Sequence, residues 1–114
     1  YTLSLHDALP ISANDPMRPV VTKLAADYKE KFKADATTFI GHPSDAMLLI
    51  EEALKKAGGS PDREKLAEAM RSGISFPGAN GMFRFTDANH NGLDRESQSM
   101  VMLQVQGGKF VTVK

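Results

Sequence analysis

Oxygen-bearing side chains alternate along one polar stretch of the chain, Asp87-x-Asn89-x-Asn91-Gly92. Oxygen ligands at alternate positions, followed by a central glycine, are typical of the first half of a calcium-binding loop because they wrap a hard cation. The twelfth position of such a loop is Gln98, which lacks the bidentate carboxylate that would close the coordination sphere. Asparagine also replaces aspartate at two earlier positions, and no helical pattern leads into the stretch. We therefore expect a polar turn or hinge loop here, and no metal ion.

The remaining reactive residue types lack the context that catalysis needs. His42 and His90 could act as bases or zinc ligands, but the chain has no cysteine and no H-E-x-x-H pattern, so turn-stabilising or exposed roles are favoured. Ser97 and Ser99 have no G-x-S-x-G context. The glycines of 78–81 precede a strand pattern rather than a helix, which argues against a phosphate-binding loop. The sequence predicts no enzyme and no cofactor.

Composition narrows the class of protein further. Among 114 residues, 14 Lys and Arg balance 14 Asp and Glu, which leaves no net field to attract nucleic acid or an anionic membrane. Hydrophobic residues make up 41%, as in ordinary globular domains, yet no apolar run approaches the roughly 20 residues of a membrane helix. We therefore expect no nucleic-acid partner and no membrane insertion. The absence of cysteine is compatible with either cytoplasm or periplasm.

The first residues do not resemble the rest of the chain. Residues 1–11 resemble the in-frame translation of a sequencing adapter, with Ser12 at the junction, and no initiator methionine is present. We treat 1–12 as an extraneous, adapter-like segment and exclude it from functional reasoning. Functional residues are expected between Ala13 and Lys114.

Apolar spacing predicts three helices. The first follows the start signal Asn14-Asp15-Pro16, and its apolar residues recur at intervals of three and four through Phe32. The second is predicted over 44–57, with Ser44 or Asp45 near its cap, and the third runs from Ser60-Pro61-Asp62 to about residue 70.

Short strands and turns are predicted between and after these helices. Residues 37–40 are β-branched and aromatic, which predicts an extended stretch, closed by a turn at 41–43. Residues 76–81 have turn chemistry and 82–85 alternate like a strand. Residues 100–105 and 109–113 are predicted to form a hairpin through Gly107-Gly108. The predicted fold class is α/β.

Several motifs occur in one order along the chain. They are Phe39-Ile40-Gly41-His42-Pro43-Ser44-Asp45-Ala46, then Glu52-Ala53-Leu54-Lys55-Lys56-Ala57-Gly58, the helix around Leu66, a Phe-x-Gly-x-x-Gly-x-Phe-like turn from Phe76 to Phe83, Asp87-x-x-His90-Asn91-Gly92-Leu93-Asp94, and a final Val105-x-Gly107-Gly108-Lys109-Phe110-Val111. This set resembles the C-terminal part of branched-chain amino-acid (Leu/Ile/Val-type) solute-binding proteins of ABC importers. Ser44 departs from the family, which usually carries Tyr or Trp there.

The resemblance implies a partial type I periplasmic-binding-protein fold, in which two α/β lobes close over a small solute and present it to a membrane permease. It assigns 13–85 to the C-terminal part of the first lobe, and 86–114 to the hinge crossing and terminal strands of the second. By position, Phe39 matches an aromatic that walls the apolar end of the cleft, and Gly41 and His42 lie in the adjoining turn. These three are the predicted ligand-binding residues.

The same resemblance implies the partners and the compartment. They are a small-molecule solute, either an amino acid or another small carboxylate, and an ABC permease, in the periplasm or on the cell surface as a lipoprotein. Because most of the family's ligand contacts precede this part of the chain, we expect these residues not to bind solute alone. The alternative is a small stand-alone interaction domain, calcium-responsive through the 87–98 loop, in which three helices and a hairpin complete a core.

Overall fold

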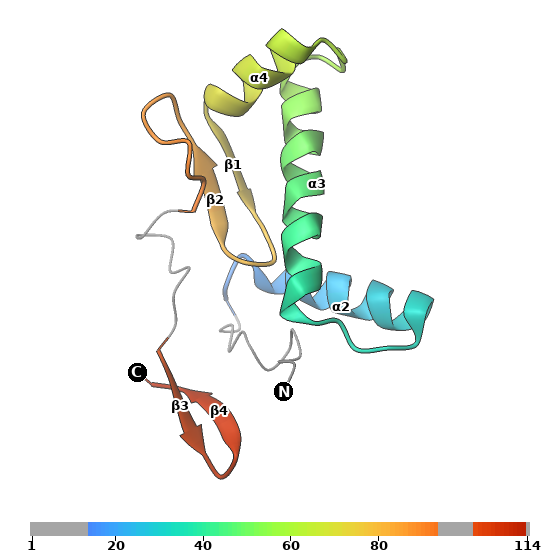
Figure 1. Cartoon of the computed structure of the whole chain (residues 1–114), viewed down its shortest axis with the longest axis vertical. Coiled ribbons are helices and arrows are strands. Elements are labelled where there is room, and N and C mark those ends of the chain that lie inside the picture. The colour runs from blue at the N-terminus through green and yellow to red at the C-terminus, as the bar shows by residue number, and fades with distance from the viewer. Residues whose placement is uncertain (1–13, 94–101, 114) are drawn as a thin grey trace.

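Within the described residues, three helices precede two separate pairs of antiparallel strands (Figure 1). The structure is a computed structural model that describes residues 14–93 and 102–113. Its elements are α2 (Arg18–Phe32), α3 (Thr38–Lys56), α4 (Arg63–Arg71), β1 (Ile74–Pro77), β2 (Met82–Phe85), β3 (Leu103–Gln106) and β4 (Lys109–Thr112). This arrangement agrees with the predicted partial α/β fold.

Helix α2 begins at Arg18 with Met17 at its N-cap, so Asp15 and Pro16 of the predicted start signal lie just before the helix. The Asp15 carboxylate accepts a hydrogen bond from the Met17 backbone N–H (2.9 Å), and its carbonyl accepts one from Arg18 (3.1 Å). These bonds satisfy N–H groups that the first turn of a helix leaves without partners. At the other end, Lys33 adopts a left-handed conformation (φ 54°) and its N–H donates to the Lys29 carbonyl.

Helix α3 is longer than predicted, and this corrects the sequence analysis at its start. Residues 38–43, expected as the end of a strand and a turn, lie in the helix, and only Thr37 at the N-cap is extended. Pro43 therefore sits inside the helix, where it cannot donate to the carbonyl of Phe39. The preference of β-branched and aromatic residues for strands depends on context. Here the helical conformation places Gly41 and Asp45 against the strands, as described below.

Helix α4 has the predicted N-cap. The Asp62 side chain accepts a hydrogen bond from the Lys65 backbone N–H (2.9 Å). Its C-terminal end is satisfied by a residue of another helix, since the Lys56 ammonium donates to the carbonyls of Ser72 and Gly73. A lysine that reaches helix C-terminal carbonyls also opposes the negative end of the helix dipole.

Strand β1 was missed by the sequence analysis, which assigned 76–81 entirely to a turn. Ile74 and Phe76 are buried and alternate with exposed Ser75, which is the pattern of a half-buried strand. β1 pairs antiparallel with β2, and the rings of Phe76 and its partner Phe83 stack with centroids 5.1 Å apart. Only 78–81 form the turn. The four-residue strand ends in proline, so it offered too short a pattern to distinguish from a loop.

The core has two parts. The larger lies between α3, α4 and the β1–β2 hairpin, and its buried members are Ala53, Ala69, Ile74 and Phe76. The smaller joins α2 to the β1–β2 turn, through Val21, Ala36 and Ala79. The hairpin thus contacts the helices both along its strands and at its turn.

The C-terminal hairpin is present as predicted, although its first strand begins at Leu103 and residues 100–101 of the predicted strand lie outside the described residues. β3 pairs with β4 from Leu103↔Thr112 to Gln106↔Lys109. Gly107 and Gly108 both have positive φ (57° and 77°), the conformation that a tight two-residue turn between twisted strands requires.

Candidate functional site

The three predicted ligand-binding residues lie together in the first two turns of α3. Phe39 is 73% exposed and His42 is also exposed, whereas Gly41 is buried. The prediction that Gly41 and His42 form a turn is wrong, because both are helical. Their role in binding a solute stays a prediction.

Gly41 is where the start of α3 meets the β1–β2 turn. A Cβ atom at this position would lie 2.8 Å from Asn80 Nδ2 and 3.3 Å from the Ala79 Cβ. Both distances are shorter than ordinary van der Waals contact. Glycine at position 41 thus allows the helix and the turn to approach each other closely.

Asp45, one helical turn after Gly41, holds the β1–β2 turn in place. Its side chain is buried (4% exposed), and both carboxylate oxygens accept hydrogen bonds. Oδ1 accepts from the Ala79 N–H (2.5 Å), and Oδ2 accepts from the Asn80 N–H (3.0 Å) and from Asn80 Nδ2 (2.8 Å). Buried carboxylates require this kind of compensation for lost hydration.

Sequence reasoning placed Asp45 near the cap of a helix and missed this role. Asp45 is instead the eighth residue of α3, well inside the helix. A signal was present, because the glycine-rich turn 78–81 carries backbone N–H groups that no strand partner could satisfy. Linking that turn to an aspartate more than thirty positions earlier required the tertiary fold.

A second glycine makes room for the carboxylate. A Cβ at Gly78 would lie 2.7 Å from Asp45 Oδ1 and 2.6 Å from the Phe83 ring. The spacing Phe-x-Gly-x-x-Gly, which carried part of the family resemblance, therefore has a steric origin at its first glycine. The Phe83 ring, which stacks on Phe76, and the Asp45 carboxylate both lie close to Gly78.

The calcium-like stretch forms a compact polar turn after β2. The Asn89 N–H donates to Thr86 Oγ1, and Asn89 Oδ1 accepts from the Asn91 N–H (both 3.0 Å). The chain then returns to β2, where the Arg84 N–H donates to the Gly92 carbonyl (2.7 Å) and Leu93 bridges to Phe83. Asn89, one of the would-be ligands, thus has its side-chain oxygen engaged in the turn itself.

The rest of that pattern is only partly described. His90 is exposed. Gln98, Ser97 and Ser99 lie outside the described residues. Within 14–93 and 102–113, no group of three or more His, Cys, Asp or Glu side chains could hold a metal ion.

Comparisons with known proteins place these features in a family. The family model for periplasmic binding proteins matches residues 8–109, most of the chain. The chain belongs to the periplasmic binding protein family. That match begins inside the adapter-like segment, whose extraneous origin stays a prediction, as do the lobe assignments of 13–85 and 86–114. No curated protein matches the sequence significantly.

A solved structure, Rp1789 from Rhodopseudomonas palustris (strain CGA009), has the same fold over this region. The TM-score is 0.74 at 24% sequence identity, over 96% of the present chain. The chain spans 32% of the length of the Rhodopseudomonas protein. At this identity the likeness establishes the fold alone.

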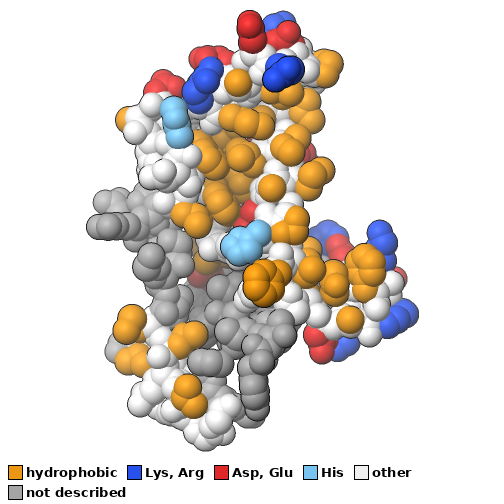
Figure 2. All heavy atoms as spheres, viewed as in Figure 1, with side chains coloured by type: hydrophobic (Ala, Val, Ile, Leu, Met, Phe, Trp, Pro, Cys, Tyr) orange, Lys and Arg blue, Asp and Glu red, His pale blue; other side chains and the backbone are white. Residues whose placement is uncertain are grey.

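An apolar groove lies between α2 and α3 of this periplasmic binding protein chain. Its lining includes Leu24, Tyr28, Phe32, Ile40, Met47 and Ile50. Phe32 and Met47 are more than half exposed, and Figure 2 shows hydrophobic side chains gathered along both helices. Helices that normally cover a parallel sheet carry apolar stripes of this kind, which stay exposed when the strands of that sheet are not part of the chain.

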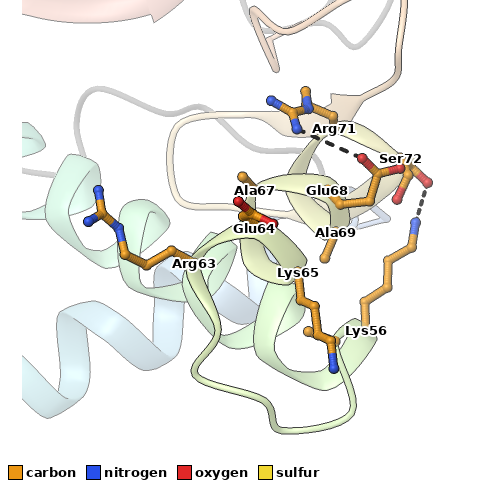
Figure 3. A pocket seen from close by; sticks show the side chains of 10 residues that line it. Lys56, Arg63, Glu64, Lys65, Ala67, Glu68, Ala69, Arg71 and Ser72 are labelled. Atoms are coloured by element: carbon orange, nitrogen blue, oxygen red, sulfur yellow. Dashed lines mark hydrogen bonds and ion pairs between the residues drawn. The ribbon is translucent and has the colours of Figure 1, made fainter.

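A second concave surface covers α4 (Figure 3). It carries charges of both signs: Lys56, Arg63, Lys65 and Arg71 beside Glu64 and Glu68. Lys56 reaches across to the Ser72 carbonyl, and Arg71 lies 3.8 Å from Glu68. Mixed charges of this kind, with Lys56 engaged at the helix end and Arg71 beside Glu68, are typical of a solvated helix face. None of the predicted ligand-binding residues lines this surface.

No helix among the described residues is long and apolar enough to cross a bilayer.

Proposed function

We propose that the chain is the C-terminal part of a solute-binding protein that serves an ABC importer for branched-chain amino acids or related small carboxylates. The family match over residues 8–109 is the observation that carries this proposal. The ordered motifs from Phe39 to Gly108 support the branched-chain type.

The start of α3 supplies the wall of the solute cleft in this proposal. Phe39, at the start of α3, is 73% exposed and so presents apolar surface whose burial by a bound solute would be favourable. An apolar solute side chain would cover this surface when the lobes close, with Gly41 and His42 alongside. The remaining contacts, including those to the solute's charged groups, would come from lobe residues outside this chain, so these 114 residues alone would not bind the solute.

The proposed mechanism makes and breaks no covalent bond. Solute binding favours the closed state because only there does the solute contact both lobes. The closed form would then dock on the permease in the periplasm, or at the cell surface if the protein is a lipoprotein. No enzyme activity and no cofactor are part of the proposal.

The test begins with the reading frame. Extension of the frame upstream in uncontaminated DNA should encode a signal peptide and two βα-rich lobes. Isothermal calorimetry on that longer protein, against branched-chain amino acids and aromatic acids, should then give saturable binding of one class. Phe39→Ala should weaken binding of apolar solutes, whereas Val105→Ala, at an exposed position in β3, should not. An absence of binding across the panel would refute the proposed solute class.

The alternative hypothesis, a stand-alone interaction domain, predicts the opposite results. Its reading frame would start close to Ala13, and residues 13–114 would form a complete core. The uncovered groove between α2 and α3 argues against completeness. Residues 13–114 can be heated while far-UV circular dichroism is recorded. A sharp, reversible transition in a monomer would favour the stand-alone domain, and a broad or irreversible one would favour the binding-protein fragment.

A further inference from the structure

We propose that Asp45 is the positioning residue of the solute site, joining the start of α3 and the β1–β2 turn into one rigid wall. The inference rests on the proposed function and extends it to a residue that contacts no solute itself. Phe39 and His42 would contact the solute, and Asp45 would act through the backbone that carries them.

The three hydrogen bonds that Asp45 accepts from Ala79 and Asn80, called the lock below, require a carboxylate. All three partners of Asp45 are N–H donors, and both oxygens are used. An amide of the same shape would turn an NH2 group toward at least one of these donors, whichever way it is oriented. Asp45→Asn therefore keeps the volume of the side chain but cannot accept all three hydrogen bonds.

The atoms around the lock are closely packed. Gly41 and Gly78 lie on either side of it, and a Cβ at either glycine would come within 2.8 Å of a lock atom, Asn80 Nδ2 or Asp45 Oδ1. Ala79 between them is completely buried and belongs to the smaller core cluster. Closely packed contacts of this kind transmit small displacements rather than absorbing them.

The geometry connects the lock to the predicted ligand-binding residues. Gly41 and Asp45 are four positions apart on α3, so they share the helix face that meets the turn. Phe39 and His42 flank Gly41 and are exposed. If the turn moves away from α3, the first turn of the helix loses the support behind Gly41, and the orientation of the Phe39 ring changes with it.

The chain offers a matched control. Asp62 is also an aspartate that accepts a backbone N–H, at the N-cap of α4. Asparagine caps helices about as well as aspartate, so Asp62→Asn should be nearly silent. Asp45→Asn makes the same chemical change where an amide does not suffice. Asn80→Ala removes one of the three bonds and should have an intermediate effect.

Backbone hydrogen exchange on the longer protein from the extended reading frame, followed over residues 14–93, tests the lock directly. In Asp45→Asn the amides of Ala79 and Asn80 should exchange about tenfold to a hundredfold faster than in the unaltered chain, because a hydrogen bond to a charged group is lost at each. The amides of α4 should keep their rates. Rates in Asp45→Asn equal to those in Asp62→Asn would overturn the proposal. Faster exchange throughout the chain would also overturn it, since Asp45 would then be a general stability residue.

Solute affinity tests the positioning role, with the longer protein from the extended reading frame. Asp45→Asn should raise the Kd for the best solute of the calorimetric panel about tenfold, and Asp62→Asn should leave it unchanged. An unchanged Kd in Asp45→Asn, with the exchange effect present, would refute positioning while leaving the proposed function intact. Failure of the unaltered protein to bind any solute would instead overturn the proposed function, and the positioning role with it.

Discussion

A disulfide between Gly41→Cys and Ala79→Cys should form readily and report the contact between α3 and the β1–β2 turn. The natural chain has no cysteine, so the introduced pair is the only source of thiols. The Cβ atoms at the two positions would be 3.3 Å apart, close to the 3.5–4.5 Å of natural disulfides. The Asn80 side-chain amide must move to admit the new atoms, and loss of its hydrogen bond to Asp45 offsets part of the gain from the disulfide.

The expected magnitude follows from the length of the closed loop. Closing a loop of about 40 residues lowers the entropy of the unfolded chain by an amount worth roughly 4 kcal/mol. Because the disulfide and the folded state stabilise each other by the same free energy, the disulfide should be about a thousandfold more stable in the folded chain than in the unfolded chain. Equilibration with reduced and oxidised glutathione, in buffer and again in concentrated urea, measures this ratio.

The control pair is Gly41→Cys with Ser75→Cys, at a similar separation along the chain. Ser75 is exposed and points to the opposite face of β1 from Phe76. This pair should show little difference between buffer and urea. Equal disulfide stability in both solvents for the Gly41–Ala79 pair would refute the close approach that Gly41 is argued to permit.

Three further predictions concern local structure. Asp62→Ala removes the N-cap of α4 and should accelerate amide exchange in that helix about fivefold, corresponding to a loss of about 1 kcal/mol; unchanged rates would show that the cap contributes nothing. Gly92→Ala introduces a Cβ at positive φ (77°) against the Phe85 ring, and should release the Arg84 N–H from the Gly92 carbonyl, seen as faster exchange at Arg84; retained protection there would contradict the steric argument. Millimolar calcium should leave the amide resonances of 87–92 unmoved because the loop lacks a closing carboxylate; saturable shifts would revive the calcium-responsive alternative.

Local signals in the sequence were sufficient for most elements. The helix start signals around Asp15 and Asp62 and the turn at Gly107-Gly108 are encoded within a few residues, so these element boundaries could be predicted approximately. The start of α3 could not, because its residues prefer strands and its proline usually ends helices. Contact with the β1–β2 turn accompanies the helical conformation there, and no local pattern contains that contact.

Part of the candidate site could be predicted from the sequence, and part of it could not. The family resemblance identified Phe39, Gly41 and His42, and the structure brings them to one end of α3. Asp45 appeared in the same motif but was interpreted as a cap, since aspartate near a helix start usually is one. Its true partners are Ala79 and Asn80, which lie more than thirty positions away.

Pro43 leaves the start of α3 with one backbone hydrogen bond fewer than a regular helix. Its missing N–H removes one backbone hydrogen bond, the one that would end on the Phe39 carbonyl. That gap falls between Phe39 and the point where Asp45 fastens the helix to the turn. The close packing of Gly41 against Asn80 and Ala79 therefore supports the first turn of α3, and with it the Phe39 backbone, at the point where one helical hydrogen bond is missing.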